Sequence, residues 1–280
     1  MYNSVSDEIS SSTEDYKEGY LKGIQDAQSK KEVIRDIVLA KESQTLFQKS
    51  LLDNYGSFYF NFYNRIKIEN QFLFRFMFVC SYMNYDNYLS NGVRLMKEDE
   101  FKNILKLKDS EYYKTKKCFL DNELISIDGK GNILINKRFC KKGEINTAKN
   151  IEVIRMFNNA IKELYDKSLP REHKKLSLLI EILPYINFRY NIICSNPDES
   201  NMELIKPIKM SELCELLGYD KTNSSKLKRM LFSLRVSGEE VIGLFEKSCG
   251  KAIFVNPRVY YKGNDEDELN LLQEMFRIII

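Results

Sequence analysis

A short pattern occurs twice in this sequence, 120 residues apart, and few folds accommodate such a pair. The first copy is Ile135-Asn136-Lys137-Arg138-Phe139 followed by Lys142-Gly143, and the second is Val255-Asn256-Pro257-Arg258-Val259 followed by Lys262-Gly263. Each copy comes after a Gly-Lys dipeptide and a run of strand-forming residues, at 129–135 and at 250–255. Such runs around a glycine-containing turn are typical of β-hairpins, so we expect a hairpin at both places.

The residues before each hairpin also correspond, because each set predicts two short helices separated by a turn. In the first half a short helix is expected at 98–105, and Ser110 is expected to cap a second helix. In the second half the short helix covers 211–217 and ends at Gly218, and Asn223 or Ser224 caps a helix that runs to about 234. Helix, turn, helix and wing is the order of a winged helix-turn-helix, so the sequence predicts two of these domains in tandem.

The predicted fold class is mainly α with small β-hairpins, an α+β protein. Apolar residues recur at helical spacing between 147 and 166, which predicts that a packed helix joins the two domains. The expected segments are a disordered start and helical arm at 1–56, a first winged-helix domain at 57–146, a connecting helix at 147–168, a second winged-helix domain at 169–263, and a C-terminal helical tail at 264–280. The tail carries an apolar stripe that is expected to pack or dimerise, and the arm to pack on the body or to mediate oligomerisation.

Charge is unevenly distributed along the chain. Residues 57–263 carry a net charge of +10, whereas residues 1–56 carry −3 and residues 264–280 carry −4. A basic body between acidic ends fits a polyanionic partner. No apolar run reaches the roughly 18 residues of a spanning helix, and the N-terminus lacks the apolar segment of a secretory signal. We therefore expect a cytoplasmic protein with no membrane partner.

The sequence contains none of the motifs that would indicate catalysis or metal binding. Its six cysteines include no C-x-x-C pair, so no metal site and no cofactor are expected. The single histidine, His173, lies in the charged stretch 171–175 and is interpreted as a surface residue at a helix start. Glycine-rich phosphate loops, G-x-S-x-G and H-E-x-x-H are absent. The sequence predicts a binding protein rather than an enzyme.

In a helix-turn-helix the second helix enters the major groove of DNA, and its outward face reads the base edges. Helical spacing places Tyr112, Thr115 and Phe119 on the inner side in the first half, and Leu227, Met230, Leu231 and Leu234 in the second. Both outward faces are expected to combine cations with hydroxyl groups and to lack carboxylates, which suits a phosphate-lined groove. The residues predicted to contact DNA are Ser110, Tyr113, Lys114, Lys117, Lys221, Thr222, Ser225, Lys228 and Arg229, together with Lys130, Lys247 and Lys251 on the wings.

Among these residues, Arg229 is the candidate for a direct base contact, since its guanidinium can bind guanine through two hydrogen bonds. The lysines of the helices are expected to contact phosphates, and those of the wings to contact phosphates or the minor groove. Two repeated residue types follow each wing. Asn136 and Asn256 are interpreted as closing a turn through their side chains. The role of Arg138 and Arg258 stays open between structure and DNA contact.

The second half resembles replication-associated winged-helix proteins of Firmicute plasmids and phages, the RepL-like group. The segments that carry the resemblance are FNNAIKELY (157–165), LPYINFR (183–189), NPDE (196–199), LLGY (216–219), NSSKLK (223–228) and FVNPRVYYKG (254–263). The resemblance covers roughly 58–263 and is weaker in the first half, where Lys137 stands in place of Pro257. It implies sequence-specific binding of double-stranded DNA at an origin or operator of a mobile element.

Three functions remain open from the sequence. The first is replication initiation or copy control of a plasmid or phage through double-stranded DNA binding, with a homodimer and host replication proteins as further partners. The second is transcriptional regulation with the same fold. The third is a protein-interaction module with degenerate winged helices, in which acidic residues would interrupt the basic helices.

Overall fold

The structure is a computed structural model that describes residues 29–35, 38–39, 57–61, 68–143, 153–247, 250–261 and 266–279. The chain divides into two compact units, residues 1–50 and residues 51–280. In the first unit, residues 29–35 and 38–39 are helical, as expected for the arm. The expected disordered start lies outside the described residues. The second unit holds both copies of the repeated pattern, and its described part is mixed α and β, as expected.

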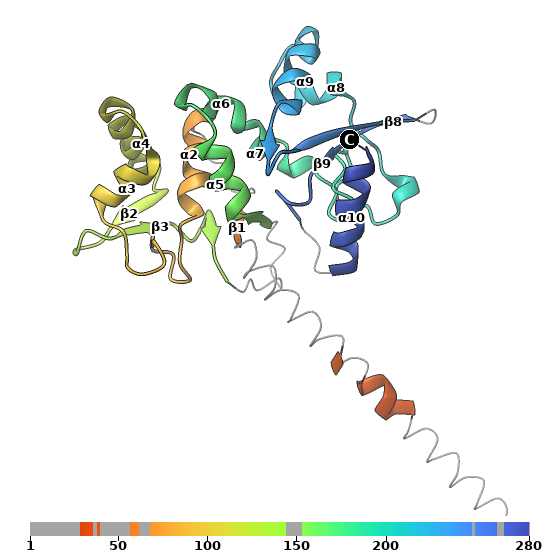
Figure 1. Cartoon of the computed structure of the whole chain (residues 1–280), viewed down its shortest axis with the longest axis horizontal. Helices are drawn as coiled ribbons and strands as arrows, with labels where there is room; N and C mark the ends of the chain where they lie inside the picture. Colours follow the sequence, from red (N-terminus) through yellow and green to blue (C-terminus); the bar gives the residue numbers. More distant parts are fainter. Residues whose placement is uncertain are drawn as a thin grey trace, which may run out of the picture. The chain divides into compact units, whose positions relative to one another are not determined.

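The first half of the second unit begins with a strand and a helix that is buried on nearly every side. Between Phe72 and Cys80 of this helix, only Leu73 is not fully buried, because apolar residues occupy all of its faces. Two further helices and a hairpin follow, close to the positions expected from the sequence (Figure 1). The elements are β1 (Ser57–Asn61), α2 (Asn70–Cys80), α3 (Glu98–Leu105), α4 (Asp109–Asp121), β2 (Ile125–Ile127), β3 (Ile133–Ile135) and β4 (Cys140–Lys141).

The second half repeats this order with additional short elements. It contains β5 (Val153–Phe157), α5 (Asn158–Asp166), η1 (Pro170–Glu172), α6 (His173–Leu176), α7 (Leu178–Glu181), η2 (Leu183–Tyr185), η3 (Met202–Leu204), α8 (Met210–Leu216), η4 (Lys221–Asn223), α9 (Ser224–Phe232), β6 (Arg235–Val236), β7 (Glu239–Glu240), β8 (Ile242–Lys247) and β9 (Gly250–Val255). Gly218 follows α8 with φ of 73°, the left-handed conformation expected of a glycine that ends a helix.

The expected connecting helix is wrong over its first part. Residues 153–157 form strand β5, and only Asn158–Asp166 are helical. The cause is tertiary, because β5 pairs antiparallel with β1 over five residue pairs, and a sheet partner overrides the helical spacing of the apolar residues. The residues before 153 lie outside the described part.

The two halves share a set of matching hydrogen bonds. Asn87 Nδ2 donates to the carbonyl of Cys140 (2.7 Å), and Asn191 Nδ2 donates to that of Tyr260 (2.8 Å). Both asparagines have positive φ, 69° and 52°. In addition, the backbone N–H of Lys97 and of Lys209, which precede α3 and α8, donates to the glutamate three residues on. The same side chains thus bind the same backbone groups in both halves.

The repeated asparagines after the wings match in the same way, as the turn interpretation predicted. Asn136 Nδ2 donates to the carbonyl of Glu123 (2.8 Å), and Asn256 Nδ2 donates to that of Glu240 (2.9 Å). Each Oδ1 accepts the backbone N–H two residues on, at 3.0 Å and 2.9 Å. In both copies the asparagine therefore joins the end of the hairpin to the residue two positions before its first strand.

A three-stranded antiparallel sheet, in the order β4-β1-β5, joins the halves. Helix α2 packs beside it on α5, α6 and α7, so the core continues from one half into the other. The Phe78 ring stacks on Tyr165 of α5, with ring centroids 3.6 Å apart. The hydroxyl of Tyr165 donates to the carbonyl of Leu105 at the end of α3 (2.6 Å).

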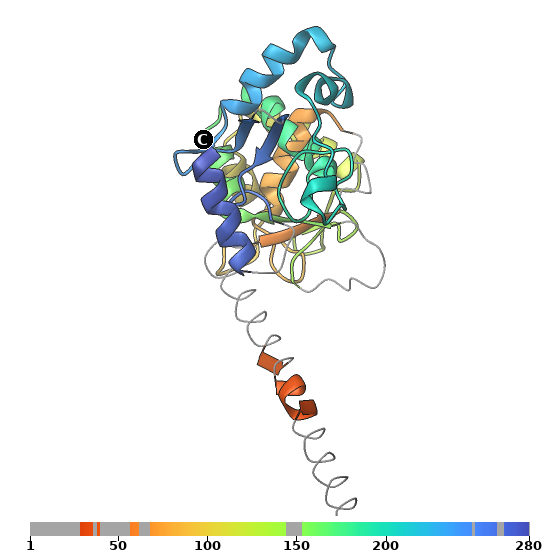
Figure 2. The same ribbon diagram turned by 90° about the vertical axis from the view of Figure 1, so that its right-hand side faces the viewer.

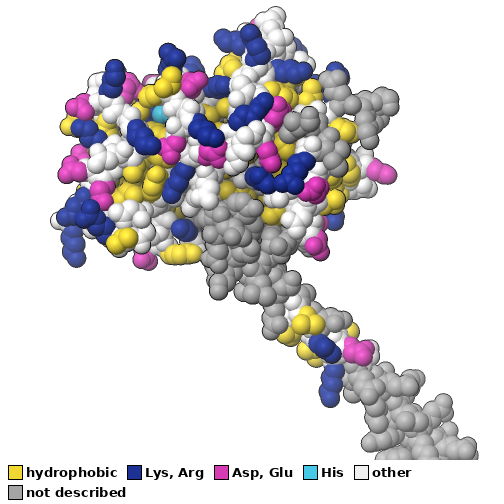
Figure 3. Space-filling view, viewed as in Figure 1, with side chains coloured by type: hydrophobic (Ala, Val, Ile, Leu, Met, Phe, Trp, Pro, Cys, Tyr) yellow, Lys and Arg dark blue, Asp and Glu magenta, His cyan; other side chains and the backbone are white. Residues whose placement is uncertain are grey.

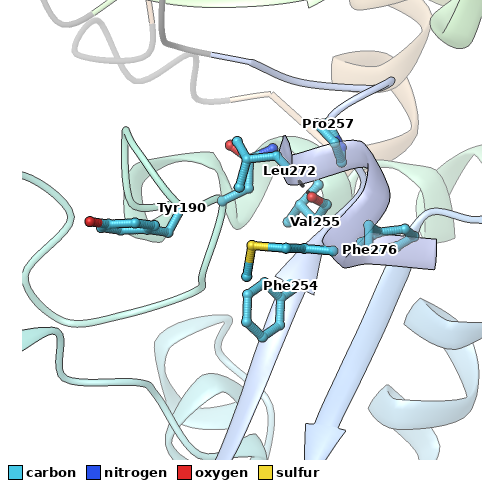
Figure 4. A pocket seen from close by; sticks show the side chains of 8 residues that line it. Tyr190, Phe254, Val255, Pro257, Leu272 and Phe276 are labelled. Carbon is cyan, nitrogen blue, oxygen red and sulfur yellow. Dashed lines mark hydrogen bonds between the residues drawn. The ribbon is translucent and has the colours of Figure 1, made fainter. Parts of the chain in front are cut away.

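Helix α10 (Glu266–Ile279) packs on the β8–β9 hairpin (Figure 2). Leu269, Leu272 and Phe276 are buried, so the predicted apolar stripe of the tail packs on its own chain. Phe276 joins a cluster with Phe254 and Ile192. A pocket lies between α10 and β9, and its lining side chains are apolar except for Asn191 (Figure 4).

Candidate nucleic-acid interface

Helix α9 presents a basic surface that carries no acidic residue. Leu227 and Leu231 are buried and anchor the helix, which leaves Lys226, Lys228 and Arg229 exposed. Within the part of the chain that the structure describes, none of these three cations forms an ion pair with a carboxylate. Lys228 Nζ lies 5.8 Å from the centre of the Phe232 ring on the same helix. Figure 3 shows Lys and Arg side chains along the upper edge of the body, over α8 and α9.

Lys226 is absent from the residues predicted to contact DNA. It precedes the inward-facing Leu227 directly, and Lys228 and Arg229 follow that leucine, so the three cations flank one anchor. The cation-rich run 226–229 is the signal in the sequence that could have identified Lys226. Ser225 is exposed on the same helix, as predicted.

Lys221 and Thr222, two of the residues predicted to contact DNA, lie just before α9 and not on it. They belong to the short helix η4, where acidic side chains engage both of them. Thr222 Oγ1 donates to Asp220 Oδ1 (2.6 Å), and Lys221 Nζ lies 2.9 Å from Glu215 Oε1. The hydrogen bonds from Thr222 lower the pKa of the Asp220 carboxyl, so this acid stays ionised beside the turn. Both residues are exposed, but their polar groups already stabilise the turn that leads into α9.

Helix α4 has the predicted inner side but a more acidic outer side than predicted. Tyr112, Thr115 and Phe119 are buried, and Ser110, Tyr113, Lys114 and Lys117 are exposed. The expectation that no carboxylate accompanies these cations is wrong. Asp109 and Glu111 lie in the first turn, with Asp109 exposed and Glu111 partly exposed. Lys114 Nζ is 3.6 Å from Glu111 Oε1, so part of the positive charge of α4 is neutralised.

Ser110 is also not the residue that caps α4. The helix begins at Asp109, the N-cap position is Lys108, and no side chain caps it. Acidic residues in the first turn instead interact favourably with the positive end of the helix dipole. Their position at the start of α4 therefore has a structural reason other than a capping hydroxyl.

A buried arginine holds α4 against the rest of the protein. Arg75 of α2 is 2% exposed, and its guanidinium donates to Thr115 Oγ1 (2.8 Å) and to Glu111 Oε2 (3.1 Å), both on α4. Its Nε donates to His173 Nδ1 of α6 (3.1 Å). One side chain therefore ties together helices from both halves. Arg75 is the only charged residue within the apolar run 72–83, and this signal in the sequence could have marked it as a buried partner.

The interpretation of His173 as a surface residue is wrong, because its side chain is 1% exposed. An arginine can only donate, so Nδ1 must be the acceptor and the proton must sit on Nε2. Nε2 is buried, and no described residue accepts a hydrogen bond from it. Burial, and then the Arg75 charge, lower the pKa of His173 to about 4. The imidazole is therefore neutral at physiological pH and faces the core.

The two wings are antiparallel hairpins, with Ile125 opposite Ile135 and Ile242 opposite Val255. At the first wing tip, Asp128 Oδ1 accepts the backbone N–H groups of Lys130 (2.8 Å) and Asn132 (2.9 Å). This turn leaves the Lys130 side chain exposed. At the second, Lys251 is exposed at the start of β9, while of Lys247 only the backbone is described. Arg258, whose role was open, pairs with Glu239 (3.3 Å), which indicates a structural part.

No family model, curated protein or solved structure matches this chain.

The described residues also hold no group of three His, Cys, Asp or Glu side chains that could bind a metal ion. No described helix combines the length and apolar character needed to cross a bilayer. The exposed ammonium, guanidinium and hydroxyl groups of α4, α9 and the wing tips can bind phosphates and base edges through hydrogen bonds and charge, and on α4 they stand beside the carboxylates of Asp109 and Glu111.

Proposed function

We propose that each half of residues 57–261 is a winged helix-turn-helix. The helix pairs α3–α4 and α8–α9 are each followed by a hairpin, and matched asparagine hydrogen bonds close both hairpins. A single such set arises readily by chance in a helical protein. Two sets with the same side chain at the same backbone groups support duplication of one domain.

The proposed function is sequence-specific binding of double-stranded DNA, with α4 and α9 in the major groove. The observation that carries it is the exposed face of α9, where three cations stand beside a hairpin with no acid on the helix. Lysine and arginine displace condensed counterions when they approach phosphates, and arginine can also bind guanine through two hydrogen bonds. Of the two helices, α9 is accordingly the better candidate for a recognition helix, and Arg229 is its candidate for a base contact.

The biological setting proposed is replication initiation or copy control of a plasmid or phage, which follows from the resemblance to the RepL-like group. Transcriptional regulation of a mobile element would use the same surface. A plasmid that carries the gene and its flanking DNA separates these roles. Loss of plasmid maintenance in a DNA-binding variant indicates replication, and unchanged maintenance with altered transcript level indicates regulation.

One observation favours a protein-interaction role for part of the molecule. Asp109 and Glu111 interrupt the positive surface of α4, which is the pattern expected of a degenerate winged helix. Under this second candidate function, α9 binds DNA and α4 docks a protein. Measuring DNA binding by variants of α4 and by variants of α9 separates this candidate from one in which both helices bind DNA.

The test is a gel-shift titration of the purified full chain with a random-sequence duplex pool, followed by sequencing of the bound fraction. We expect retention at low salt and a steep loss of affinity as salt rises, because several phosphates are neutralised. Lys228→Ala with Arg229→Ala should weaken binding to the selected duplex by roughly tenfold or more. The matched control is Lys167→Ala with Arg189→Ala, which removes the same charge from cations already paired with Glu163 and Glu268. Equal affinity of both double variants contradicts the assignment of α9.

A further inference from the structure

The pairing between β1 and β5 is self-complementary. Equivalent positions in the two halves can be assigned from matching hydrogen bonds. Asn87 binds the carbonyl of Cys140 and Asn191 binds that of Tyr260, so Cys140 and Tyr260 are equivalent. Phe60 pairs with Cys140, and Met156 pairs with Tyr260, both antiparallel. Phe60 and Met156 are therefore equivalent, and β5 corresponds to β1 at 96 positions further along the chain.

This correspondence maps the β1–β5 register onto itself. At the centre of the pairing, Tyr59 lies opposite Arg155, and Arg155 is the residue of the second half that is equivalent to Tyr59. On either side, the pair Phe58–Met156 exchanges with Phe60–Ile154, and Ser57–Phe157 exchanges with Asn61–Val153. Such an exchange occurs in an isologous interface, where the same surface meets itself across a two-fold axis. A local two-fold axis therefore passes between Tyr59 and Arg155.

The helices beside this sheet agree with the same axis. The bridges Met83–Leu89 and Ile186–Ile193 match in the two halves, which makes the region of α6 and α7 the equivalent of α2. These equivalent helices pack on each other, and Arg75 of α2 donates to His173 of α6. Equivalent elements thus meet at the junction in both the strand and the helix layers.

From this symmetry we infer that one chain recognises an inverted repeat in DNA, with α4 on one half-site and α9 on the other; this inference rests on the proposed DNA binding. A two-fold axis between two recognition helices matches the two-fold axis of an inverted repeat, whereas a translation would match a direct repeat. The exposed residues of α4 and α9 differ, with acids on α4 only. The two half-sites therefore differ in sequence, and the repeat is imperfect.

The experiment starts from the half-sites that the full chain selects from a random-sequence duplex pool. Duplexes then carry the two half-sites inverted, in direct orientation, or inverted with the spacer lengthened by half a helical turn, about 5 base pairs. Affinity is measured by gel shift at one salt concentration, and the number of chains per duplex by analytical ultracentrifugation. We expect one chain per inverted duplex and at least about tenfold weaker binding to the other two arrangements.

Variants assign each helix to its half-site. Lys228→Ala with Arg229→Ala should remove the footprint from one half-site, and Lys114→Ala with Lys117→Ala should remove it from the other. Equal or tighter binding to the direct repeat, or two chains on one inverted repeat, overturns the inference while DNA binding stands. If no duplex is retained at low salt, the proposed function itself fails and the inference with it.

Discussion

Arg75 illustrates how one residue can decide the position of a helix. Its guanidinium is enclosed by α2, α4 and α6, and each of its three described hydrogen bonds leads to a different side chain. A guanidinium is stable in such a place only when its donors are satisfied, because burying an unpaired charge costs several kcal/mol. The charge on Arg75 therefore fixes where Thr115 and His173 lie.

Replacing Arg75 with alanine should lower the free energy of unfolding by about 2–4 kcal/mol, since it removes the buried hydrogen bonds to Thr115 and His173 and the partly buried ion pair with Glu111, and leaves a cavity. Urea denaturation measures the effect. The control is Arg94→Ala, because Arg94 also pairs with a glutamate at 3.1 Å but is largely exposed. Its removal should change stability by less than about 0.5 kcal/mol. Equal effects of both variants would show that the Arg75 contacts do not stabilise the fold.

Because the buried His173 has a lowered pKa, we expect the protein to lose stability at mildly acidic pH. Its pKa falls from 6.5 in the unfolded chain to about 4 in the folded protein, so between these values the unfolded chain binds more protons. The free energy of unfolding should decrease as the pH falls from about 6.5 to about 4, by up to about 3 kcal/mol from this residue. Denaturation at several pH values measures the slope. His173→Gln should flatten it, and an unchanged slope in that variant assigns it to other groups.

Among elements, the hairpins depend on two equivalent asparagines outside them. Asn87 and Asn191 each bind two carbonyl groups from a conformation with positive φ, which alanine adopts poorly. Alanine at either position should cost about 2–3 kcal/mol in urea denaturation, and the two costs should be similar. Asn103→Ala in α3 is the control, since Asn103 is exposed on a helix and its replacement should cost nothing. Strongly unequal costs at 87 and 191 would argue against equivalent halves.

The C-terminal helix offers a second comparison. Phe276 is buried against the second hairpin, whereas Leu271 on the same helix is 61% exposed. Phe276→Ala should lower the free energy of unfolding by about 3–5 kcal/mol, and Leu271→Ala by less than about 0.5 kcal/mol. The measurement is again urea denaturation. Similar small effects would mean that α10 does not contribute to the core of the second half.

The sequence predicted most elements of the body but not the contacts between the halves. Local signals located α3, α8 and both hairpins, because a turn or a glycine marks each boundary, as Gly218 does after α8. The strand at 153–157 was missed because its conformation depends on β1, which lies nearly a hundred residues away. His173 was misjudged for the same reason, since its partner Arg75 is distant in the sequence. The exposure of Lys228 and Arg229 was predicted correctly because it follows from the spacing of the apolar residues on the helix that carries them, whereas Lys226 was missed.

For the whole molecule, the shared sheet and the packing of α2 on α6 predict that both halves unfold together. Arg75→Ala should therefore lower the free energy of the opening that permits amide hydrogen exchange, and by the same amount in peptides from α4 and from α9. Mass spectrometry of exchanged peptides measures this. Faster exchange confined to residues 68–143 would instead indicate two domains that unfold independently.

The local two-fold axis has a consequence for how occupancy of a site would depend on protein level. A symmetric binder made of two separate chains must first assemble, so at low abundance its bound fraction grows with the square of the amount of protein. Here a single chain would carry both recognition helices, so the bound fraction would grow in direct proportion to the amount of protein. Under the proposed function, the response to protein level would be graded rather than abrupt, with no threshold set by dimerisation.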